Sequence, residues 1–533
     1  MKQLNKLLAL ALAVIMVMAL ATTALADGAG ADNVTITVNN ALAGGTYEAY
    51  KIFNVTKATD TDGKVISYAY TITSGEGDGA NPFFTTVSGF ATEQNGLTLT
   101  QIGTTGVYNV TFNSDVFDEN KAKSLSQSLY SVATSQDNLI TATKTVTASK
   151  DNNNDVTATF TGLTEGYYLI TSPIGSTCIL DTTVGTKEIN EKNGLPNIEK
   201  KVDKSDGDTT EKWADTNDAA FGDTVKFKIT VKAEAGAQNY VVTDTLPNGL
   251  TLNSTGTNGI TVKGPKDSND PATLAETTDY TVSFDEGNSN KFSVTFVQTY
   301  LDSLKNNAEL TITYNATVSN NNVEIAGNGN VNTAKLTYGS NQEIQDTTTT
   351  YVWSFSVLKF TKGTNSNETP LASAKFKLYK KYDPSKNELS EEMKFTKNRE
   401  STTYMYDAKN GSAEITTGDT GAFTFTGLDS GTYYLVETAA PTGYNQLTKP
   451  IEVKIAGTDS TAPAKGSVSY KDLATNTNET TATNNQVKVE NKAGSILPST
   501  GGIGTTIFYV LGGILVVGAG VLLVTKKRMS NSK

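Results

Sequence analysis

The stretch Gly431-Thr-Tyr-Tyr-Leu-Val-Glu-Thr-Ala-Ala-Pro-Thr-Gly-Tyr444 decides the fold class of this 533-residue chain. Side chains alternate across a β-strand, so Tyr433, Leu435 and Glu437 share one face. The segment 162–171 repeats the pattern of 427–437, with Thr171 in the position of Glu437. The composition is rich in Thr, Asn, Gly, Val and Tyr and poor in Leu, and together with this strand pattern it predicts an all-β protein.

Short alternating segments separated by turn residues continue through the chain, and tandem immunoglobulin-like antiparallel β-sandwich domains explain them best. The clearest early strands are 34–38, 47–53 and 167–170, and a short helix is expected at 119–132. We expect an extended surface loop at 251–281. The predicted organisation is a signal peptide (1–26), an N-terminal domain (27–192), a middle domain (193–352), a C-terminal domain (353–494) and a sorting segment (495–533).

The residue counts exclude several classes of function. The chain has no His and a single Cys, Cys178, so zinc sites, His-based catalysis and an internal disulfide are excluded. Cys178 is expected to be a small buried apolar residue. We expect no metal and no cofactor, and the net charge of −11 argues against a nucleic-acid partner.

Several ionisable or amide side chains fall on the apolar faces of predicted strands. In Ile198-Glu-Lys-Lys-Val202, Lys200 shares the apolar face, whereas Lys201 points the other way and remains the alternative candidate. The same parity gives one set in the middle block (Lys200, Asp244, Asn332) and one in the last block (Lys359, Glu437, Asn491). The alternative is that these strand ends bend out into water.

Burial of such a set favours a covalent reaction. A buried Lys has a lowered pKa and a buried acid a raised pKa, which together give a neutral amine beside a protonated carboxyl group. The amine can attack the Asn amide carbon and expel ammonia, leaving a Lys–Asn isopeptide bond.

Both ends of the chain carry targeting patterns. Lys2 and Lys6 precede the apolar run 7–20, and Ala24-Leu25-Ala26 offers a small-x-small cleavage site, so a secretory signal peptide is expected to end there. The C-terminal pattern has three parts in order: the pentapeptide Leu497-Pro498-Ser499-Thr500-Gly501, the apolar run 503–524 and the basic residues Lys526, Lys527 and Arg528. That run is long enough to cross a bilayer.

The C-terminal pattern resembles the sorting signal of Gram-positive cell-wall proteins. The resemblance implies that a sortase cuts between Thr500 and Gly501 and passes the Thr acyl group to an amine. An ordinary membrane anchor with an accidental pentapeptide is the alternative.

The last block resembles a Cna B-type domain, and 431–444 resembles the E box of sortase-assembled pilins. This resemblance implies that Lys359 bonds to Asn491, promoted by Glu437. The middle block resembles the middle domain of the same shaft pilins, which implies the same roles for Lys200, Asn332 and Asp244. Because Thr171 replaces the E-box acid in the first block, no isopeptide bond is expected in the N-terminal domain.

A polymer also needs an amine that receives the next Thr500. Shaft pilins carry it in a pilin motif between the first and second domains, and the matching segment here is Ile189-Asn-Glu-Lys192-Asn193. The resemblance therefore points to Lys192, with Lys187 as the rival, although the usual Tyr and Pro of the motif are absent. An ordinary solvated hinge lysine is the alternative for Lys192.

The sequence thus predicts the shaft subunit of a sortase-assembled pilus, secreted and attached to the cell wall, rather than an enzyme. Expected partners are a class C-type pilus sortase, copies of the same chain, minor pilins, a housekeeping sortase and peptidoglycan; a host ligand is not predicted. The main alternative is a monomeric wall-anchored adhesin, and a secreted hydrolase on β modules is a weaker one.

Overall fold

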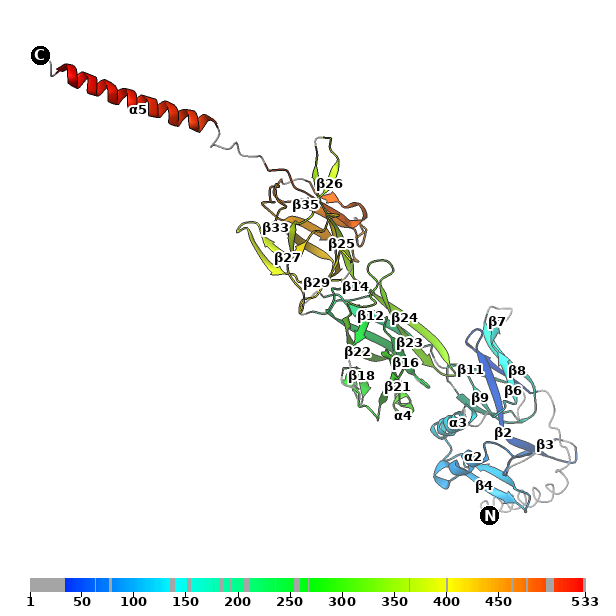
Figure 1. Cartoon of the computed structure of the whole chain (residues 1–533). Coiled ribbons are helices and arrows are strands. Elements are labelled where there is room, and N and C mark those ends of the chain that lie inside the picture. Colours follow the sequence, from blue (N-terminus) through cyan, green and yellow to red (C-terminus); the bar gives the residue numbers. More distant parts are fainter. Residues whose placement is uncertain are drawn as a thin grey trace. The chain divides into compact units, whose positions relative to one another are not determined.

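The computed structural model describes residues 34–494 and 503–530, except for 63, 76–78, 135–139, 151–154, 176, 183–185, 192–193, 206–209, 235, 254–258, 267, 364, 399–400, 462–463 and 476–477. The chain divides into two compact units, Met1–Val352 and Trp353–Lys533. The described part is built mainly of β-strands, as the sequence predicts (Figure 1).

The first unit begins with an N-terminal sheet pair. Its strands are β1 (Val34–Asn39), β2 (Thr46–Thr59), β3 (Val65–Thr73), β4 (Leu97–Ile102), β5 (Val107–Phe112), β6 (Lys144–Thr147), β7 (Ser149–Lys150), β8 (Val156–Leu163), β9 (Gly166–Thr171), β10 (Thr177–Asp181) and β11 (Lys187–Asn190). One sheet has the order β11-β1-β8-β7 and the other β10-β9-β2-β3-β5-β4, with β6 paired to β2. The two sheets share an apolar core that includes Ile36, Tyr47, Phe160 and Tyr168.

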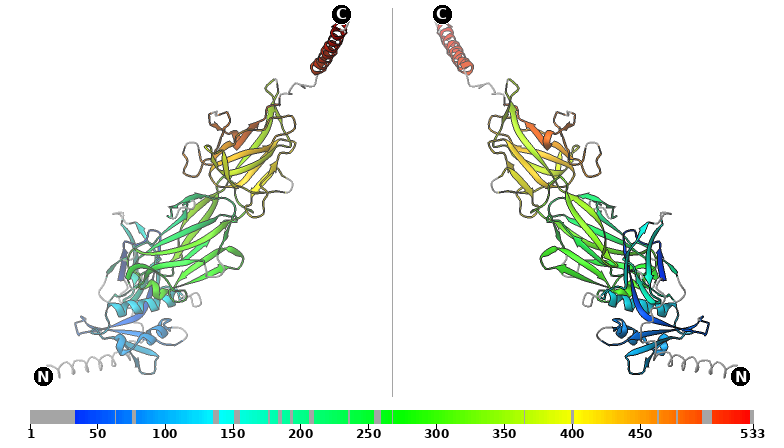
Figure 2. Two further views of the ribbon diagram at one scale, coloured as in Figure 1. Left: turned by 90° about the vertical axis from the view of Figure 1, so that its left-hand side faces the viewer. Right: turned by 90° about the vertical axis from the view of Figure 1, so that its right-hand side faces the viewer.

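Helices cover a second core in this sheet pair. The expected helix is present as α3 (Glu119–Ala133), with Asp118 accepting a hydrogen bond from the Lys121 N–H as its N-cap. It packs against β9 and β10 (α3 is cyan in Figure 2) through the buried Leu125 and Leu129. A shorter helix, α2 (Phe84–Phe90), was not anticipated from the sequence.

A middle sheet pair completes the first unit. Its strands are β12 (Asn197–Asp203), β13 (Trp213–Ala214), β14 (Thr216–Asp218), β15 (Thr224–Ala233), β16 (Val241–Thr245), β17 (Leu250–Leu252), β18 (Thr261–Lys266), β19 (Ser268–Thr273), β20 (Tyr280–Asp285), β21 (Asn288–Phe296), β22 (Ala308–Val318), β23 (Asn330–Tyr338) and β24 (Gln342–Tyr351), with the short helix α4 (Gln298–Leu301) before β22. One sheet has the order β13-β12-β15-β22-β18-β19, with β17 on β22, and the other β14-β24-β23-β16-β21-β20. The expectation of a loop at 251–281 is wrong, because β18 and β19 fall within it, β17 and β20 overlap its ends, and residues such as Val262 are fully buried.

The second unit contains the C-terminal sheet pair. Its strands are β25 (Trp353–Lys362), β26 (Glu368–Pro370), β27 (Lys375–Asp383), β28 (Glu388–Glu392), β29 (Phe395–Lys397), β30 (Thr403–Tyr406), β31 (Ile415–Thr416), β32 (Ala422–Leu428), β33 (Gly431–Ala439), β34 (Ile451–Ile455), β35 (Val468–Asp472), β36 (Thr480–Thr481) and β37 (Gln486–Glu490). One sheet has the order β26-β25-β32-β30-β29, with β37 on β25, and the other β28-β27-β33-β34-β35-β36, with β31 on β27.

Most strand pairs are antiparallel, but the terminal strands are an exception. The last strand of the N-terminal pair, β11, runs parallel to the first, β1, and β37 runs parallel to β25 in the same way. These parallel pairings of first and last strands were not predicted from the sequence.

The chain ends in helix α5 (Ile503–Ser530), red in Figure 1. Its segment Phe508–Met529 has a mean hydropathy of 2.3 and is long and apolar enough to cross a membrane. The predicted apolar span is therefore present as a helix. The signal peptide and the pentapeptide 497–501 lie outside the described residues.

Candidate cross-linking sites

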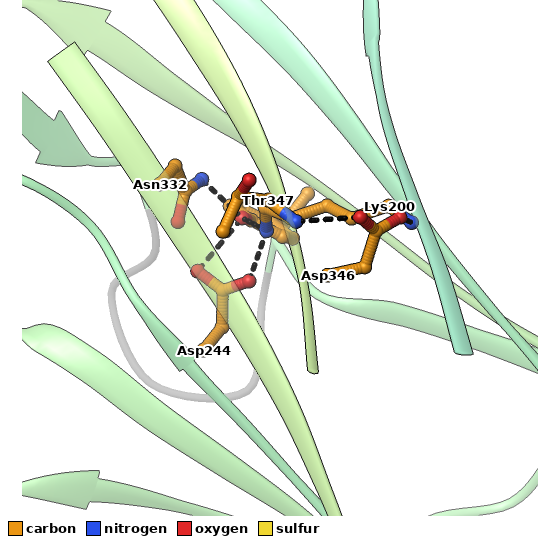
Figure 3. Close-up of polar contacts among 6 residues, drawn as sticks. Lys200, Asp244, Asn332, Asp346 and Thr347 are labelled. Carbon is orange, nitrogen blue, oxygen red and sulfur yellow. Dashed lines mark hydrogen bonds and ion pairs between the residues drawn. The ribbon is translucent and has the colours of Figure 1, made fainter. Parts of the chain in front are cut away.

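The predicted set of the middle sheet pair is buried together. Lys200, Asp244 and Asn332 each have an exposed fraction of 0%. Lys200 comes from β12 in one sheet, whereas Asp244 on β16 and Asn332 on β23 come from the facing sheet. Figure 3 shows Asp244 and Asn332 directed toward one point, with Lys200 on a separate strand. A bond between Lys200 and Asn332 would therefore join the two sheets.

One tyrosine connects all three of these side chains. The Lys200 ammonium group forms a buried ion pair with Asp244 and donates a 2.8 Å hydrogen bond to Tyr314 Oη. Tyr314 Oη donates to Asp244 Oδ1 at 2.8 Å and accepts from Asn332 Nδ2 at 2.8 Å. Asn332 Oδ1 is buried without a hydrogen-bond partner among the described residues.

Burial shifts the ionisation of this cluster in the direction that the sequence predicts. Loss of solvation lowers the pKa of Lys200 and raises the pKa of Asp244, against their mutual attraction. The same cause raises the pKa of Tyr314 well above its ordinary value. Burial therefore shifts this cluster toward a neutral amine beside a protonated carboxyl group, and it keeps the phenol neutral.

The structure separates the two lysine candidates on β12. Lys200 points between the sheets, where the rings of Phe227 and Tyr314 each lie 5.3 Å from its Nζ atom. Lys201 instead makes surface ion pairs with Glu199 (3.1 Å) and Asp215 (2.7 Å). Lys201 is thus turned away from Asp244 and Asn332.

The predicted set of the C-terminal sheet pair is also buried together. Lys359, Glu437 and Asn491 have exposed fractions of 0%, 2% and 1%. The Lys359 ammonium group donates to Asn491 Oδ1 and lies 3.1 Å from Glu437 Oε1, which accepts from Asn491 Nδ2 at 2.9 Å. The Leu447 N–H holds the other oxygen, Glu437 Oε2, at 2.9 Å. One carboxylate oxygen therefore contacts both nitrogens of the expected reaction.

The geometry of this second set differs from the first. Lys359 on β25 pairs with Val489 on the parallel strand β37, and Asn491 follows two residues later. The amine and the amide thus come from neighbouring strands of one sheet, and Glu437 on β33 comes from the other sheet. Burial lowers the pKa of Lys359 to about 8, so a large fraction of its amine is neutral at moderately alkaline pH.

The N-terminal sheet pair has no comparable set at the matching positions. Val38 on β1 pairs with Ile189 on the parallel strand β11, as Lys359 pairs with Val489. Glu191 lies two residues after Ile189, as Asn491 lies two residues after Val489, so Glu191 is at the position that corresponds to Asn491. Glu191 accepts a 3.1 Å hydrogen bond from Tyr47 Oη. The position of the E-box acid is held by Thr171, which is buried. A valine and a glutamate cannot form the Lys–Asn bond.

The other predicted residues are only partly described. Lys192, Asn193 and Thr500 lie outside the described residues. Lys187 is half-buried at the start of β11, where its backbone pairs with Ile36. Cys178 is half-buried on β10 rather than fully buried, so that expectation is wrong in degree.

Sequence reasoning missed Tyr314. It lies on β22, where every second residue from Ala308 to Val318 is buried, so parity alone marks it as one more core aromatic. What distinguishes Tyr314 is the set of hydrogen-bond partners of its hydroxyl group, and two of these, Lys200 and Asp244, lie on strands far away in sequence. The available signal was the general rule that a buried tyrosine hydroxyl finds a polar partner.

Comparisons with known proteins agree with this architecture. Residues 221–342 match the family model of the Gram-positive pilin backbone subunit 2, Cna-B-like domain, and 356–468 match the SpaA prealbumin-like fold domain. Residues 489–531 match the LPXTG cell wall anchor motif. A search of curated proteins found no match.

Solved backbone pilins are similar to the chain at low identity. The T6 backbone pilin of Streptococcus pyogenes is 20% identical over 79% of this chain and 80% of its own, with a TM-score of 0.49. The major pilin SpaA of Corynebacterium diphtheriae is 16% identical over 86% of this chain and 100% of its own, with a TM-score of 0.43. Since both TM-scores lie below 0.5, the family models carry the assignment. The chain is a cell-wall-anchored surface protein that contains Gram-positive pilin backbone domains.

Proposed function

We propose that this protein is the structural shaft subunit of a covalent cell-surface pilus, with internal Lys–Asn isopeptide bonds in its middle and C-terminal sheet pairs. The observation that carries the proposal is the occurrence of two complete, fully buried Lys/acid/Asn sets in a chain with pilin domains and a wall-anchor motif. One such set could be structural, but an unreacted buried charge is costly. Two sets support a common chemistry.

The internal reaction begins with a proton transfer. In each set, the lysine ammonium group gives a proton to the neighbouring carboxylate, and the resulting amine attacks the Asn carbonyl carbon. The new C–N bond forms as the bond to Nδ2 breaks. The attacking nitrogen loses one further proton, the leaving nitrogen gains one, and ammonia departs.

The polymerisation step uses different residues. A class C-type pilus sortase cleaves between Thr500 and Gly501 and transfers the Thr500 acyl group to Lys192 of another copy, with Lys187 as the alternative acceptor. A housekeeping sortase then joins the finished polymer to peptidoglycan, and minor pilins join the same assembly. Helix α5 holds the precursor in the membrane before cleavage, which its length and hydropathy support.

Internal bonds suit a subunit that carries tension. Each bond would enclose a loop of 132 residues, as the separation of Lys359 from Asn491 shows. Treated as a disulfide loop of that size, the cross-link contributes roughly 4–5 kcal/mol through chain entropy. Unlike a disulfide, an amide is not opened by reductants.

Intact-mass spectrometry of the mature chain, 27–500, tests the internal chemistry. Each bond expels one ammonia, about 17 Da, so we expect a deficit of two ammonias. Asp244→Ala and Glu437→Ala should each reduce the deficit to one. A mass equal to the sequence mass would overturn the internal bonds.

A denaturing gel of the full precursor incubated with a pilus sortase tests the polymer separately. A ladder that resists boiling supports the shaft subunit. Attachment of single chains to peptidoglycan without a ladder would favour the monomeric adhesin.

A further inference from the structure

Tyr314 has a saturated hydroxyl group at the centre of the middle site. A tyrosine hydroxyl offers one donor and two acceptor lone pairs. Tyr314 Oη uses all three: it accepts from Lys200 Nζ and from Asn332 Nδ2 and donates to Asp244 Oδ1, each at 2.8 Å. The attacking nitrogen and the leaving nitrogen of the proposed bond thus share one oxygen atom.

The contacts of Glu437 in the C-terminal site can be compared with those of the Tyr314 hydroxyl group. There, Glu437 Oε1 contacts both Lys359 Nζ (3.1 Å) and Asn491 Nδ2 (2.9 Å), so a single oxygen connects the two nitrogens. In the middle site the acid is Asp244, whose side chain is one methylene shorter. Asp244 contacts Lys200 and Tyr314, whereas Asn332 Nδ2 donates its hydrogen bond to Tyr314.

We propose that Tyr314 is a catalytic residue of the middle site and relays a proton between Lys200 and Asn332. It would connect the two nitrogens in the way that the longer side chain of Glu437 connects them in the C-terminal site. After Lys200 Nζ attacks Asn332 Cγ, the attacking nitrogen passes one proton to Tyr314 Oη, while Tyr314 turns its own proton from Asp244 Oδ1 and gives it to Asn332 Nδ2. The Cγ–Nδ2 bond breaks, ammonia leaves, and Tyr314 is again a phenol. This relay rests on the internal bonds proposed above.

The surroundings keep the phenol fixed and neutral. The Tyr314 ring stacks on Phe227 at a centroid distance of 5.3 Å and meets Phe292 edge-on at 5.0 Å. Burial raises the pKa of Tyr314, so the hydroxyl carries its proton at the start of the reaction.

The test follows ammonia loss during refolding of denatured, uncross-linked chain, quenched at intervals and analysed by intact mass and cross-linked peptides. Tyr314→Phe keeps the ring that stacks on Phe227 but lacks the hydroxyl. We expect the middle bond to form on the order of 10²-fold more slowly in this variant, the size of a general acid–base contribution. The C-terminal bond of the same molecule should form at its normal rate and serves as the internal standard of folding.

Two further variants separate a relay from a packing effect. Tyr338→Phe removes the hydroxyl of another buried tyrosine on β23 and should leave both bonds unchanged. Tyr314→Phe/Asp244→Glu restores an acid of the length used at the C-terminal site, and we expect it to recover most of the lost rate.

The outcomes distinguish the two levels of the proposal. Normal formation of the middle bond in Tyr314→Phe, or a slow double variant in which the C-terminal bond still forms normally, would overturn the relay. Absence of both bonds in the unaltered chain would instead overturn the proposed internal chemistry. A slow middle bond that the longer acid rescues supports the relay.

Discussion

Asn332 and Thr348 are cross-strand partners in the antiparallel pair of β23 and β24. Asn332 therefore lies opposite a residue only four positions before the end of the first unit at Val352, although the 19 residues 333–351 separate Asn332 from Val352 in sequence. In the C-terminal unit, by contrast, Asn491 directly follows the last strand, β37. The proposed middle bond thus leaves the segment from Asn332 to Val352 outside its covalent loop, whereas the C-terminal bond leaves no strand of the described sheet pair after Asn491 outside its loop.

This difference predicts an extensible middle sheet pair. Tension applied through Lys200 would pass to Asn332 across the bond and then load residues 333–352, peeling β24 from β23 one pair at a time. In single-molecule force spectroscopy of the mature chain, we expect a step of about 5–6 nm, which is the extended length of roughly 7 nm from Asn332 to Val352 less the roughly 1.4 nm that separates them in the folded sheet. The Asn332→Ala chain should release a much longer segment. If the unaltered chain showed no short step at forces that open this variant, the prediction would be wrong.

The sequence predicted the inward-facing side chains well but not how they meet. Parity placed Lys200 and Lys359 on apolar faces because alternation is a local property of a strand. It could not show that Lys200 meets its partners across the sandwich while Lys359 meets Asn491 within one sheet, since strand pairing is set by distant segments. The role of Tyr314 was hidden for the same reason.

The strand β24 at the end of the middle sheet pair was harder to identify from the sequence. The sequence of β24, Gln342-Glu-Ile-Gln-Asp-Thr-Thr-Thr-Thr-Tyr351, is polar and lacks a clear apolar alternation. Alternation alone therefore does not mark β24 as a strand, although it follows β23 and pairs with it along the whole length of β23. Four threonines complete the sheet because β-branched residues suit a pleated surface.

Substitutions at adjacent lysines of β12 should have opposite consequences. Lys200→Met removes the nucleophile and the cross-link, so we expect the deficit from the variant's own sequence mass to fall from two ammonias to one, and a loss of roughly 4–5 kcal/mol in unfolding free energy. Lys201→Met removes only surface ion pairs, and its effect should stay within about 0.5 kcal/mol. Chemical denaturation with intact-mass analysis measures both. Equal effects of the two substitutions would contradict the assignment of Lys200.

The uncross-linked C-terminal unit should become more stable as the pH rises. In Asn491→Ala, Lys359 stays buried without a bond, and its folded-state pKa of about 8 lies below the ordinary 10.5 because burial disfavours the charge. Between these two values the unfolded chain binds more protons, so folding stability increases with pH. We expect a gain of about 1–2 kcal/mol between pH 8 and 9.5. The matched variant Lys359→Met/Asn491→Ala lacks the titrating group, and the prediction fails if its pH profile is the same.

The N-terminal sheet pair should remain free of isopeptide bonds. Val38, Thr171 and Glu191 occupy the positions that correspond to Lys359, Glu437 and Asn491 in the C-terminal sheet pair. After proteolysis of the mature chain, cross-linked peptides should join only the segments with Lys200 to Asn332 and Lys359 to Asn491. A cross-linked peptide drawn from residues 34–190 would reveal a third cross-linking site and contradict this prediction.

The acceptor of polymerisation should be Lys192 rather than Lys187. Lys187 is half-buried, and its backbone is fixed in β11 beside Ile36, so presenting its amine to a sortase active site would require opening a strand pair. Lys192 lies after the end of that strand in the sequence. With sortase present, we expect Lys192→Ala to abolish the covalent ladder on a denaturing gel and Lys187→Ala to retain it. Both variants should keep the two-ammonia mass deficit, because the internal bonds use other lysines. A ladder that persists in Lys192→Ala and disappears in Lys187→Ala would reassign the acceptor to the strand.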